Sequence, residues 1–236
     1  MKPNQKVLFA CGSTLLALLL LAGCTPKAVP VASGAASFKA RKILILPFTD
    51  MASIYGQGES VRCPLCGSML TTGPVKKGGV AFLTAKLKEM VEKKTGITLI
   101  PTQRVLGVYT TLLNQNGLPY PEVDIVAKTG RHFGADAVLA GNLYRFKERD
   151  GTDYAVKTPA SVAFTLVLVR VSDGRVIWSG MFDETQQPLF ENIFKLGLFF
   201  KRKGKWVTAE ALAVQGLGQV LAELPLKPAS PSGDSS

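Results

Sequence analysis

Two cysteines lie three residues apart in the stretch Arg62-Cys63-Pro64-Leu65-Cys66-Gly67, and this spacing allows three kinds of chemistry. A Cys-Pro-x-Cys-Gly turn lets two thiolates converge on a tetrahedral zinc ion, although zinc needs four ligands. A complete site would require a second subunit or carboxylates. In an oxidising compartment the same pair forms a disulfide that staples the loop. The third alternative is a redox-active thiol pair. Gly67 stands where a covalent haem motif has histidine, which argues against haem attachment.

A further cysteine, Cys24, follows an apolar run. Lys2 and Lys6 precede this run, which extends from Val7 to Ala22 and is shorter than the roughly 20 residues of a membrane span. It ends in Leu21-Ala22-Gly23-Cys24, which resembles the lipobox of bacterial lipoproteins. The resemblance implies that residues 1–23 are a cleaved signal peptide and that Cys24 receives a diacylglycerol and an amide-linked fatty acid such as palmitate. The alternative is an ordinary secretory signal with an incidental cysteine.

The resemblance also implies a location and a lipid partner. Thr25 rather than aspartate follows the cysteine, and by the sorting habit of enterobacterial lipoproteins this implies the outer membrane, facing the periplasm. Several acyl chains together give an essentially permanent membrane anchor. Cys11 leaves with the signal peptide, so Cys63 and Cys66 are the only remaining free pair.

The charge of the mature chain limits its partners. Without Lys2 and Lys6, 26 basic and 17 acidic residues remain, a net charge of +9. Such a protein could face anionic lipid, acidic polysaccharide or the carboxylates of peptidoglycan. The sequence has no stripe of alternating basic and aromatic residues, so nucleic acid is not an expected partner.

The elements that must hold these cysteines follow from hydrophobic periodicity. A segment from Met51 to Pro74, which carries Cys63 and Cys66, is expected to be a long loop. Asp173-Gly174 between two strand-like runs predicts a hairpin with a type I′ turn. Predicted strands are Lys42–Phe48, Ile97–Ile100, Ala137–Phe146, Ser161–Val171 and Arg175–Phe182, and predicted helices run from Val80 to Gly96, Arg104 to Leu113, Pro121 to Gly134 and Thr208 to Leu224.

This pattern predicts an α/β fold with one mixed sheet, part parallel and part antiparallel, covered by helices. The strand–helix–strand unit from Lys42 to Ile100 predicts a parallel pair. Residues 24–40 are expected to form a lipidated flexible tether, residues 41–224 the periplasmic domain, and residues 225–236 a disordered tail.

Four stretches then carry a second resemblance: Ile43–Asp50, Ile97–Val105, Gly134–Phe146 and Asp173–Gly180. In this order they resemble a group of bacterial envelope lipoproteins that share one α/β domain. The group includes the curli-secretion channel lipoprotein, the Pel polysaccharide-export lipoprotein and the lipoprotein activator of a penicillin-binding protein. The resemblance implies a scaffold that forms a homo-oligomer or contacts an envelope protein. This implication rests on likeness of fold, which does not specify the exact function.

The segment from Pro188 to Trp206 departs from these relatives. Its aromatic residues followed by cations suit the membrane interface, a subunit contact or a buried helix at one end of the sheet. The candidate contact residues are Phe190, Phe194, Phe199, Phe200, Lys201, Arg202, Lys203 and Trp206.

Nothing in the sequence indicates an enzyme. His132, the only histidine, lies in a predicted helix without a nucleophile motif, and the Gly73–Gly79 stretch lacks the spacing of a phosphate-binding loop. We therefore expect a non-enzymatic outer-membrane lipoprotein that assists assembly, export or regulation in the cell envelope. We expect no cofactor apart from possible zinc at Cys63 and Cys66. The alternative is a periplasmic metal-binding or thiol-redox accessory module that uses these two cysteines.

Overall fold

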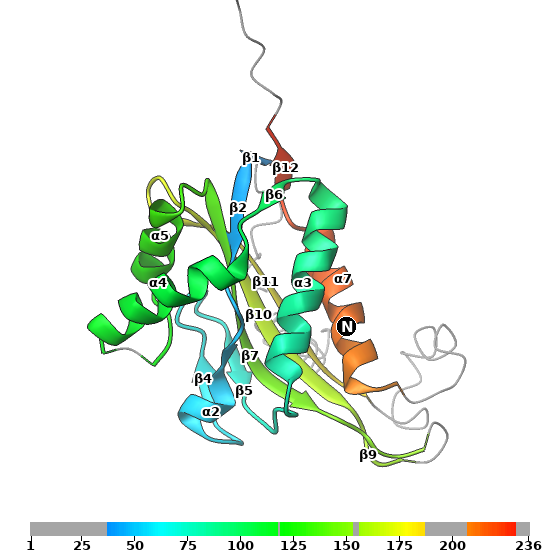
Figure 1. The fold of residues 1–236 in the computed structure, drawn as a ribbon. Coiled ribbons are helices and arrows are strands. Elements are labelled where there is room, and N and C mark those ends of the chain that lie inside the picture. Colours follow the sequence, from blue (N-terminus) through cyan, green and yellow to red (C-terminus); the bar gives the residue numbers. More distant parts are fainter. Residues whose placement is uncertain (1–36, 118, 153–155, 187–206, 230–236) are drawn as a thin grey trace, which may run out of the picture. The chain divides into compact units, whose positions relative to one another are not determined.

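The main sheet forms from apolar runs of the described domain. A computed structural model describes residues 37–117, 119–152, 156–186 and 207–229, all within the compact unit 35–236. Residues 1–23, predicted to be a signal peptide, Cys24 and the segment 187–206 lie outside the described residues. The main sheet has the order β11-β10-β7-β2-β6, and β3 also pairs with β7 (Figure 1). Its strands are β2 (Lys42–Ile45), β3 (Thr49–Asp50), β6 (Thr98–Leu99), β7 (Ala137–Lys147), β10 (Ser161–Arg170) and β11 (Val176–Thr185).

The sheet is mixed, as the sequence predicted. Strand β2 is parallel to β6 and β7, while β10 is antiparallel to β7 and to β11. The parallel pair β2–β6 confirms the predicted strand–helix–strand unit. Three two-stranded sheets accompany the main one and contain β1 (Phe38–Ala40) with β12 (Leu226–Pro228), β4 (Ser60–Arg62) with β5 (Met69–Thr71), and β8 (Asp150–Gly151) with β9 (Val156–Thr158).

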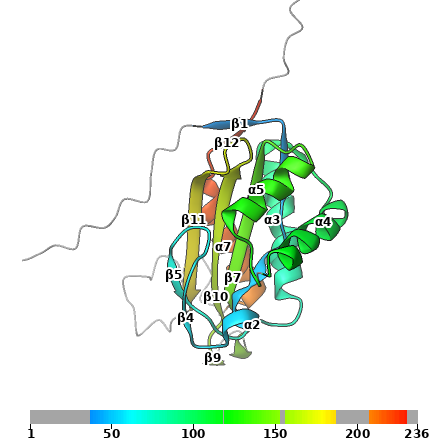
Figure 2. The ribbon, with the colours of Figure 1, turned by 90° about the vertical axis from the view of Figure 1, so that its left-hand side faces the viewer.

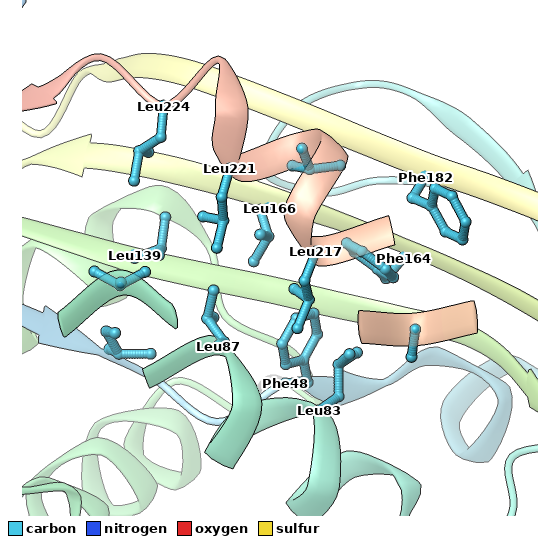
Figure 3. Close-up of a cluster of buried hydrophobic side chains, with 14 of the residues drawn as sticks. Phe48, Leu83, Leu87, Leu139, Phe164, Leu166, Phe182, Leu217, Leu221 and Leu224 are labelled. Carbon is cyan, nitrogen blue, oxygen red and sulfur yellow. The ribbon is translucent and has the colours of Figure 1, made fainter. Parts of the chain in front are cut away.

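Two helices cover one face of the sheet. These are α3 (Gly79–Thr95) and α7 (Ala209–Ala222), which lie side by side in Figure 1. Phe48, Phe164 and Phe182 pack there with leucines of both helices (Figure 3). At the N-terminus of α7, Thr208 accepts a hydrogen bond from the Ala211 amide at 3.2 Å, which confirms the predicted capping residue.

The opposite face is covered by α4 (Thr102–Gln115), α5 (Val123–His132), the short helix α2 (Met51–Tyr55) and the β4–β5 hairpin (Figure 2). Helix α5 approaches closely at Gly130. A Cβ atom there would lie 2.7 Å from Val138 Cγ2 and even closer to Val171. Glycine at this position therefore lets the helix pack against β7 and the residue after β10.

The segment from Met51 to Pro74 is not the long loop that the sequence suggested. Asp50 accepts a hydrogen bond from the Ser53 amide at 3.0 Å and so caps α2. Val61 and Leu70 are buried opposite each other in the β4–β5 hairpin. Strands of three residues are too short for periodicity to reveal them, which explains the error.

The hairpin between β10 and β11 is confirmed, but its connection is longer than a two-residue type I′ turn. Strand β10 ends at Arg170 and β11 begins at Val176. The Gly174 amide donates to the Arg170 carbonyl at 2.9 Å, and Gly174 has a φ of 69°. Asp173, within this connection, forms an ion pair with Arg170 at the end of β10.

The two ends of the described domain lie beside each other. Strands β1 and β12 are parallel, and the Phe38 amide donates to the Pro225 carbonyl at 2.7 Å. The strand Phe38–Ala40 falls within the predicted tether, and Leu226–Pro228 falls within the predicted tail. Strands therefore occur a few residues beyond each predicted boundary of the domain.

Candidate functional site

The β4–β5 hairpin places the cysteine pair on the sheet face that carries α4 and α5. The hairpin pairing continues beyond the strands, because the Cys63 amide donates to the Ser68 carbonyl at 2.7 Å. The Gly67 amide donates to the Cys63 carbonyl at 2.9 Å, and Gly67 has a φ of 76°. Such a left-handed conformation favours glycine. The Cys-Pro-Leu-Cys-Gly sequence is therefore the turn of a hairpin.

Cys63 and Cys66 form a disulfide in this turn, with their Cα atoms 5.4 Å apart. This is one of the three alternatives that the spacing left open. Zinc binding by the reduced pair stays a prediction. Among the described residues, no group of three or more His, Cys, Asp or Glu side chains is gathered as a metal site would require.

The two sulfurs have different surroundings. Cys63 is 1 % exposed and belongs to the apolar cluster under the hairpin, whereas Cys66 is partly exposed at its margin. The Cys66 amide donates to Cys63 Sγ at 3.1 Å. Asn142 Nδ2 and Thr165 Oγ1, from β7 and β10, each lie 3.6 Å from the same sulfur. Cys63 is therefore fixed against the sheet, and Cys66 forms the outer half of the bond.

Polar side chains gather beneath the disulfide, at the centre of the sheet. Asn142, Tyr144 and Thr165 are at most 1 % exposed. Asn142 Oδ1 and the Tyr144 hydroxyl make no hydrogen bond of good geometry with the described residues. Burial raises the pKa of Tyr144 to about 12, although Thr165 and Asn142 lie close enough to oppose the rise slightly. Burial likewise raises the pKa of Tyr109, on α4, to about 12.

An open pocket of about 570 Å³ lies beside the turn. The side chains of Tyr55 and Tyr120 form a stacked pair at its edge, with ring centroids 6.0 Å apart. Partial burial and the hydrogen bond with Tyr120 raise the pKa of Tyr55 to about 12. The pocket is also lined by Arg62, Cys63 and Leu65, so it combines aromatic, cationic and apolar surface. Sequence periodicity gave no sign of this pocket, because its residues come from three separate segments.

Arg145 on β7 fixes the hairpin to the sheet. Its Nη1 donates to the Thr71 carbonyl at 3.0 Å, its Nη2 pairs with Asp183 Oδ1 at 2.5 Å, and its Nε donates to Ser161 Oγ. One guanidinium thus joins β5, β10 and β11. Gly73 makes room for it, since a Cβ atom there would lie 2.8 Å from Arg145 Cδ. No local sequence pattern singles out Arg145, because its partners lie far away in the sequence.

Gln186 and Val207, the described residues on either side of the candidate contact segment, are hydrogen-bonded to each other. The Val207 backbone amide donates to the side-chain Oε1 of Gln186 at 3.1 Å, and the backbone amide of Gln186, which is 5 % exposed, donates to the Ala160 carbonyl at 3.0 Å. The two residues therefore lie side by side. The proposed contacts of Phe190, Phe194, Phe199 and Phe200, and those of Lys201, Arg202, Lys203 and Trp206, lie outside the described residues.

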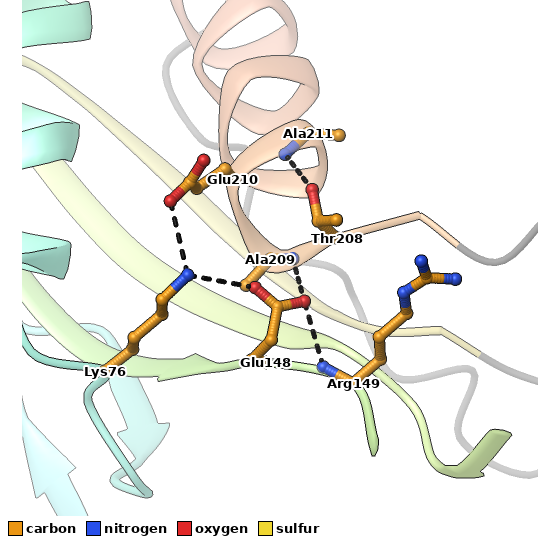
Figure 4. Close-up of polar contacts among 7 residues, drawn as sticks. All are labelled: Lys76, Glu148, Arg149, Thr208, Ala209, Glu210 and Ala211. Carbon is orange, nitrogen blue, oxygen red and sulfur yellow. Dashed lines mark hydrogen bonds and ion pairs between the residues drawn. The ribbon is translucent and has the colours of Figure 1, made fainter. Parts of the chain in front are cut away.

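A polar cluster holds the start of α7 (Figure 4). Glu148 Oε1 accepts from the Ala209 amide at 3.1 Å, and Lys76 Nζ lies 3.4 Å from Glu148 Oε2 and 3.3 Å from Glu210 Oε1. The two carboxylates raise the pKa of Lys76. These charged groups satisfy a helix terminus and one another, which is a structural use.

Two other titratable residues that the sequence offered as candidates, Asp136 and His132, make contacts within the fold. Asp136 Oδ2 accepts from the amides of Arg41 and Lys42 at 2.7 and 3.0 Å, as expected for a residue that satisfies backbone donors. His132 is exposed at the end of α5, against the ring of Phe133. Within the described ranges, no helix is long and apolar enough to cross a membrane.

Comparison with known proteins gives structural likenesses only. No protein-family model matches the chain, and no curated protein matches it significantly. The PelC dodecamer of Paraburkholderia phytofirmans aligns at 12 % identity and a TM-score of 0.46, covering 82 % of this chain and 94 % of that one. The LpoB C-terminal domain of Salmonella enterica aligns at 18 % identity and a TM-score of 0.35, covering 63 % of this chain and 86 % of that one. Lipoprotein GNA1162 of Neisseria meningitidis aligns at 19 % identity and a TM-score of 0.37, covering 69 % of this chain and 92 % of that one. Likeness at this level carries no functional argument.

Proposed function

We propose that this protein is an outer-membrane lipoprotein whose periplasmic α/β domain serves as a non-enzymatic scaffold in cell-envelope assembly, export or regulation. The observation that carries the proposal is Leu21-Ala22-Gly23-Cys24 at the end of an apolar run preceded by Lys2 and Lys6. A thiol after small residues at this position suits acylation, and the acyl chains hold the protein at a bilayer. The net charge of +9 after cleavage favours anionic envelope surfaces.

The uses of the charged side chains in the domain support a scaffold. Asp50 and Glu148 satisfy helix termini, Asp136 satisfies strand amides, and Arg145 joins three strands. Each of these groups is engaged in holding the fold. An enzyme instead needs a nucleophile, base or acid directed at a substrate.

Strand β11 supplies a surface for self-association or partner docking. It forms one edge of the main sheet, and no other described strand pairs with its outer side. An edge strand presents backbone groups that can pair with another chain. Met181, near its middle, is 54 % exposed. In the sequence, the segment that contains the candidate aromatic contacts follows this strand.

Replacing Met181 with lysine tests this surface. We expect the full chain in detergent to self-associate, and Met181→Lys to weaken association at least about tenfold, because a charge on an edge strand opposes pairing. Light scattering during size-exclusion chromatography measures the effect. Met69→Lys is the matched control, since Met69 is 57 % exposed on β5. Equal effects of both substitutions, or a monomeric parent protein, would exclude self-association through β11.

A further inference from the structure

We propose that the Cys63–Cys66 disulfide undergoes thiol exchange, that Cys66 is the sulfur attacked by an external thiolate, and that Cys63 is the leaving group. The co-reactant is a thiol, in the cell a dithiol protein that faces the same compartment. This inference does not depend on the scaffold function, because it rests only on the surroundings of the two sulfurs.

Access favours attack at Cys66. A thiolate attacks a disulfide sulfur along the line of the S–S bond, from the side opposite the leaving sulfur. Cys63 lies inward, 1 % exposed, with Asn142 and Thr165 against its Sγ. Cys66 lies outward and is partly exposed. Cys63 also borders the pocket of about 570 Å³, but its slight exposure leaves little surface for a nucleophile there.

The hydrogen-bond donors favour Cys63 as the leaving group. The Cys66 amide points at Cys63 Sγ from 3.1 Å, and Asn142 Nδ2 lies 3.6 Å away. The Thr165 hydroxyl, also at 3.6 Å, can turn its proton toward the sulfur. Hydrogen bonds to an ionised group are stronger than those to a neutral one. These donors therefore stabilise the negative charge that develops on Cys63 as the bond breaks.

The reaction balances with a thiol as the only co-reactant. The external thiolate forms a bond to Cys66 Sγ, the Cys63–Cys66 bond breaks, and its electron pair stays on Cys63 Sγ as a thiolate. A second thiolate then attacks the external sulfur of the mixed disulfide, and Cys66 leaves as a thiolate. Two electrons pass from the two external thiols to the protein, and the new thiolates equilibrate with protons of the solvent.

The hairpin makes the exchange reversible. The bonds from the Cys63 amide to the Ser68 carbonyl and from the Gly67 amide to the Cys63 carbonyl do not involve sulfur. Val61, Leu65 and Leu70 keep the hairpin on the apolar cluster. The turn therefore persists after reduction and holds the two thiols close enough to close again.

The position of the mixed disulfide tests the proposal. The full chain is incubated with glutathione, remaining thiols are blocked with N-ethylmaleimide, and fragmentation mass spectrometry locates the glutathione within the peptide that begins at Cys63. We expect at least about tenfold more adduct on Cys66 than on Cys63, since exchange follows access to the sulfur. Adduct on Cys63, equal adduct on both, or a bond that excess glutathione leaves intact would overturn the proposal.

Substitution of Thr165 tests the role of the donors. Thr165→Val removes the hydroxyl, and we expect reduction by glutathione to slow about three- to tenfold, because the leaving thiolate loses a donor. Thr165→Ser keeps the hydroxyl and serves as the matched control, with a rate close to that of the parent protein. Equal rates in the two variants would contradict the stabilised leaving group even where both proteins fold.

Discussion

Tyr144 shows how a buried polar residue couples this domain to pH. Its hydroxyl is buried in the middle of β7 and makes no well-formed hydrogen bond with the described residues. Burial raises its pKa to about 12, so the folded protein keeps this proton where an unfolded chain, with a tyrosine pKa of about 10, releases it. Stability that is fully present below pH 10 is therefore lost as the pH rises toward 12.

The substitution Tyr144→Phe tests this link between pH and stability. At pH 8 we expect the free energy of unfolding to change by less than about 1 kcal/mol, or to rise, because the lost hydroxyl was unsatisfied. Between pH 8 and pH 11 the variant should lose about 1 kcal/mol less stability than the parent protein. Urea unfolding at both pH values measures the difference. A loss of about 2 kcal/mol at pH 8 would instead reveal a hydrogen bond to Tyr144.

At the scale of single residues, the sequence predicted which chemistry a side chain can do, but not which groups surround that side chain in the fold. The spacing of Cys63 and Cys66 allowed a disulfide, zinc or redox chemistry, and only the fold shows that one sulfur faces Asn142 and the other faces outward. Arg145 and Gly73 could not be found in the same way. Their contact joins residues 72 positions apart, and no local pattern encodes it.

At the scale of elements, hydrophobic periodicity predicted the long helices and strands but missed the short ones. Helix α7 spans 14 residues, and its predicted apolar face, from Ala209 to Leu221, is the buried one. Strands β4 and β5 have three residues each, and helix α2 has five. The hairpin also depends on Arg145 as a tertiary partner, and this contact joins residues 74 positions apart, which a reading of local sequence does not include.

The packing of α7 on the sheet gives a paired prediction. A Cβ atom at Gly216 would lie 2.5 Å from Phe182 Cδ1, whereas at Gly218 it would meet only Met90 Cε at 3.8 Å. We expect Gly216→Ala to lower the free energy of unfolding by about 1–3 kcal/mol through overpacking. Gly218→Ala on the same helix should raise it by about 0.5–1 kcal/mol, since alanine favours helix. Denaturant unfolding compares them, and equal effects would mean that α7 does not pack through Gly216.

At the scale of the whole molecule, the sequence predicted a mixed α/β sheet with helices on it, and the structure confirms this. The predicted ends were less accurate, because the pairing of β1 with β12 joins residues from opposite ends of the chain. This pairing places the first described strand beside the last one.

We predict that Cys24 becomes the acylated first residue of the mature protein. Intact-mass spectrometry of the native protein, extracted from membranes, tests it most directly. We predict a chain that begins at Cys24 and carries a diacylglycerol and a further fatty acid, and we predict that Cys24→Ser retains residues 1–23 without lipid. A mature chain that begins at Met1, or a residue 24 without fatty chains, would contradict the account.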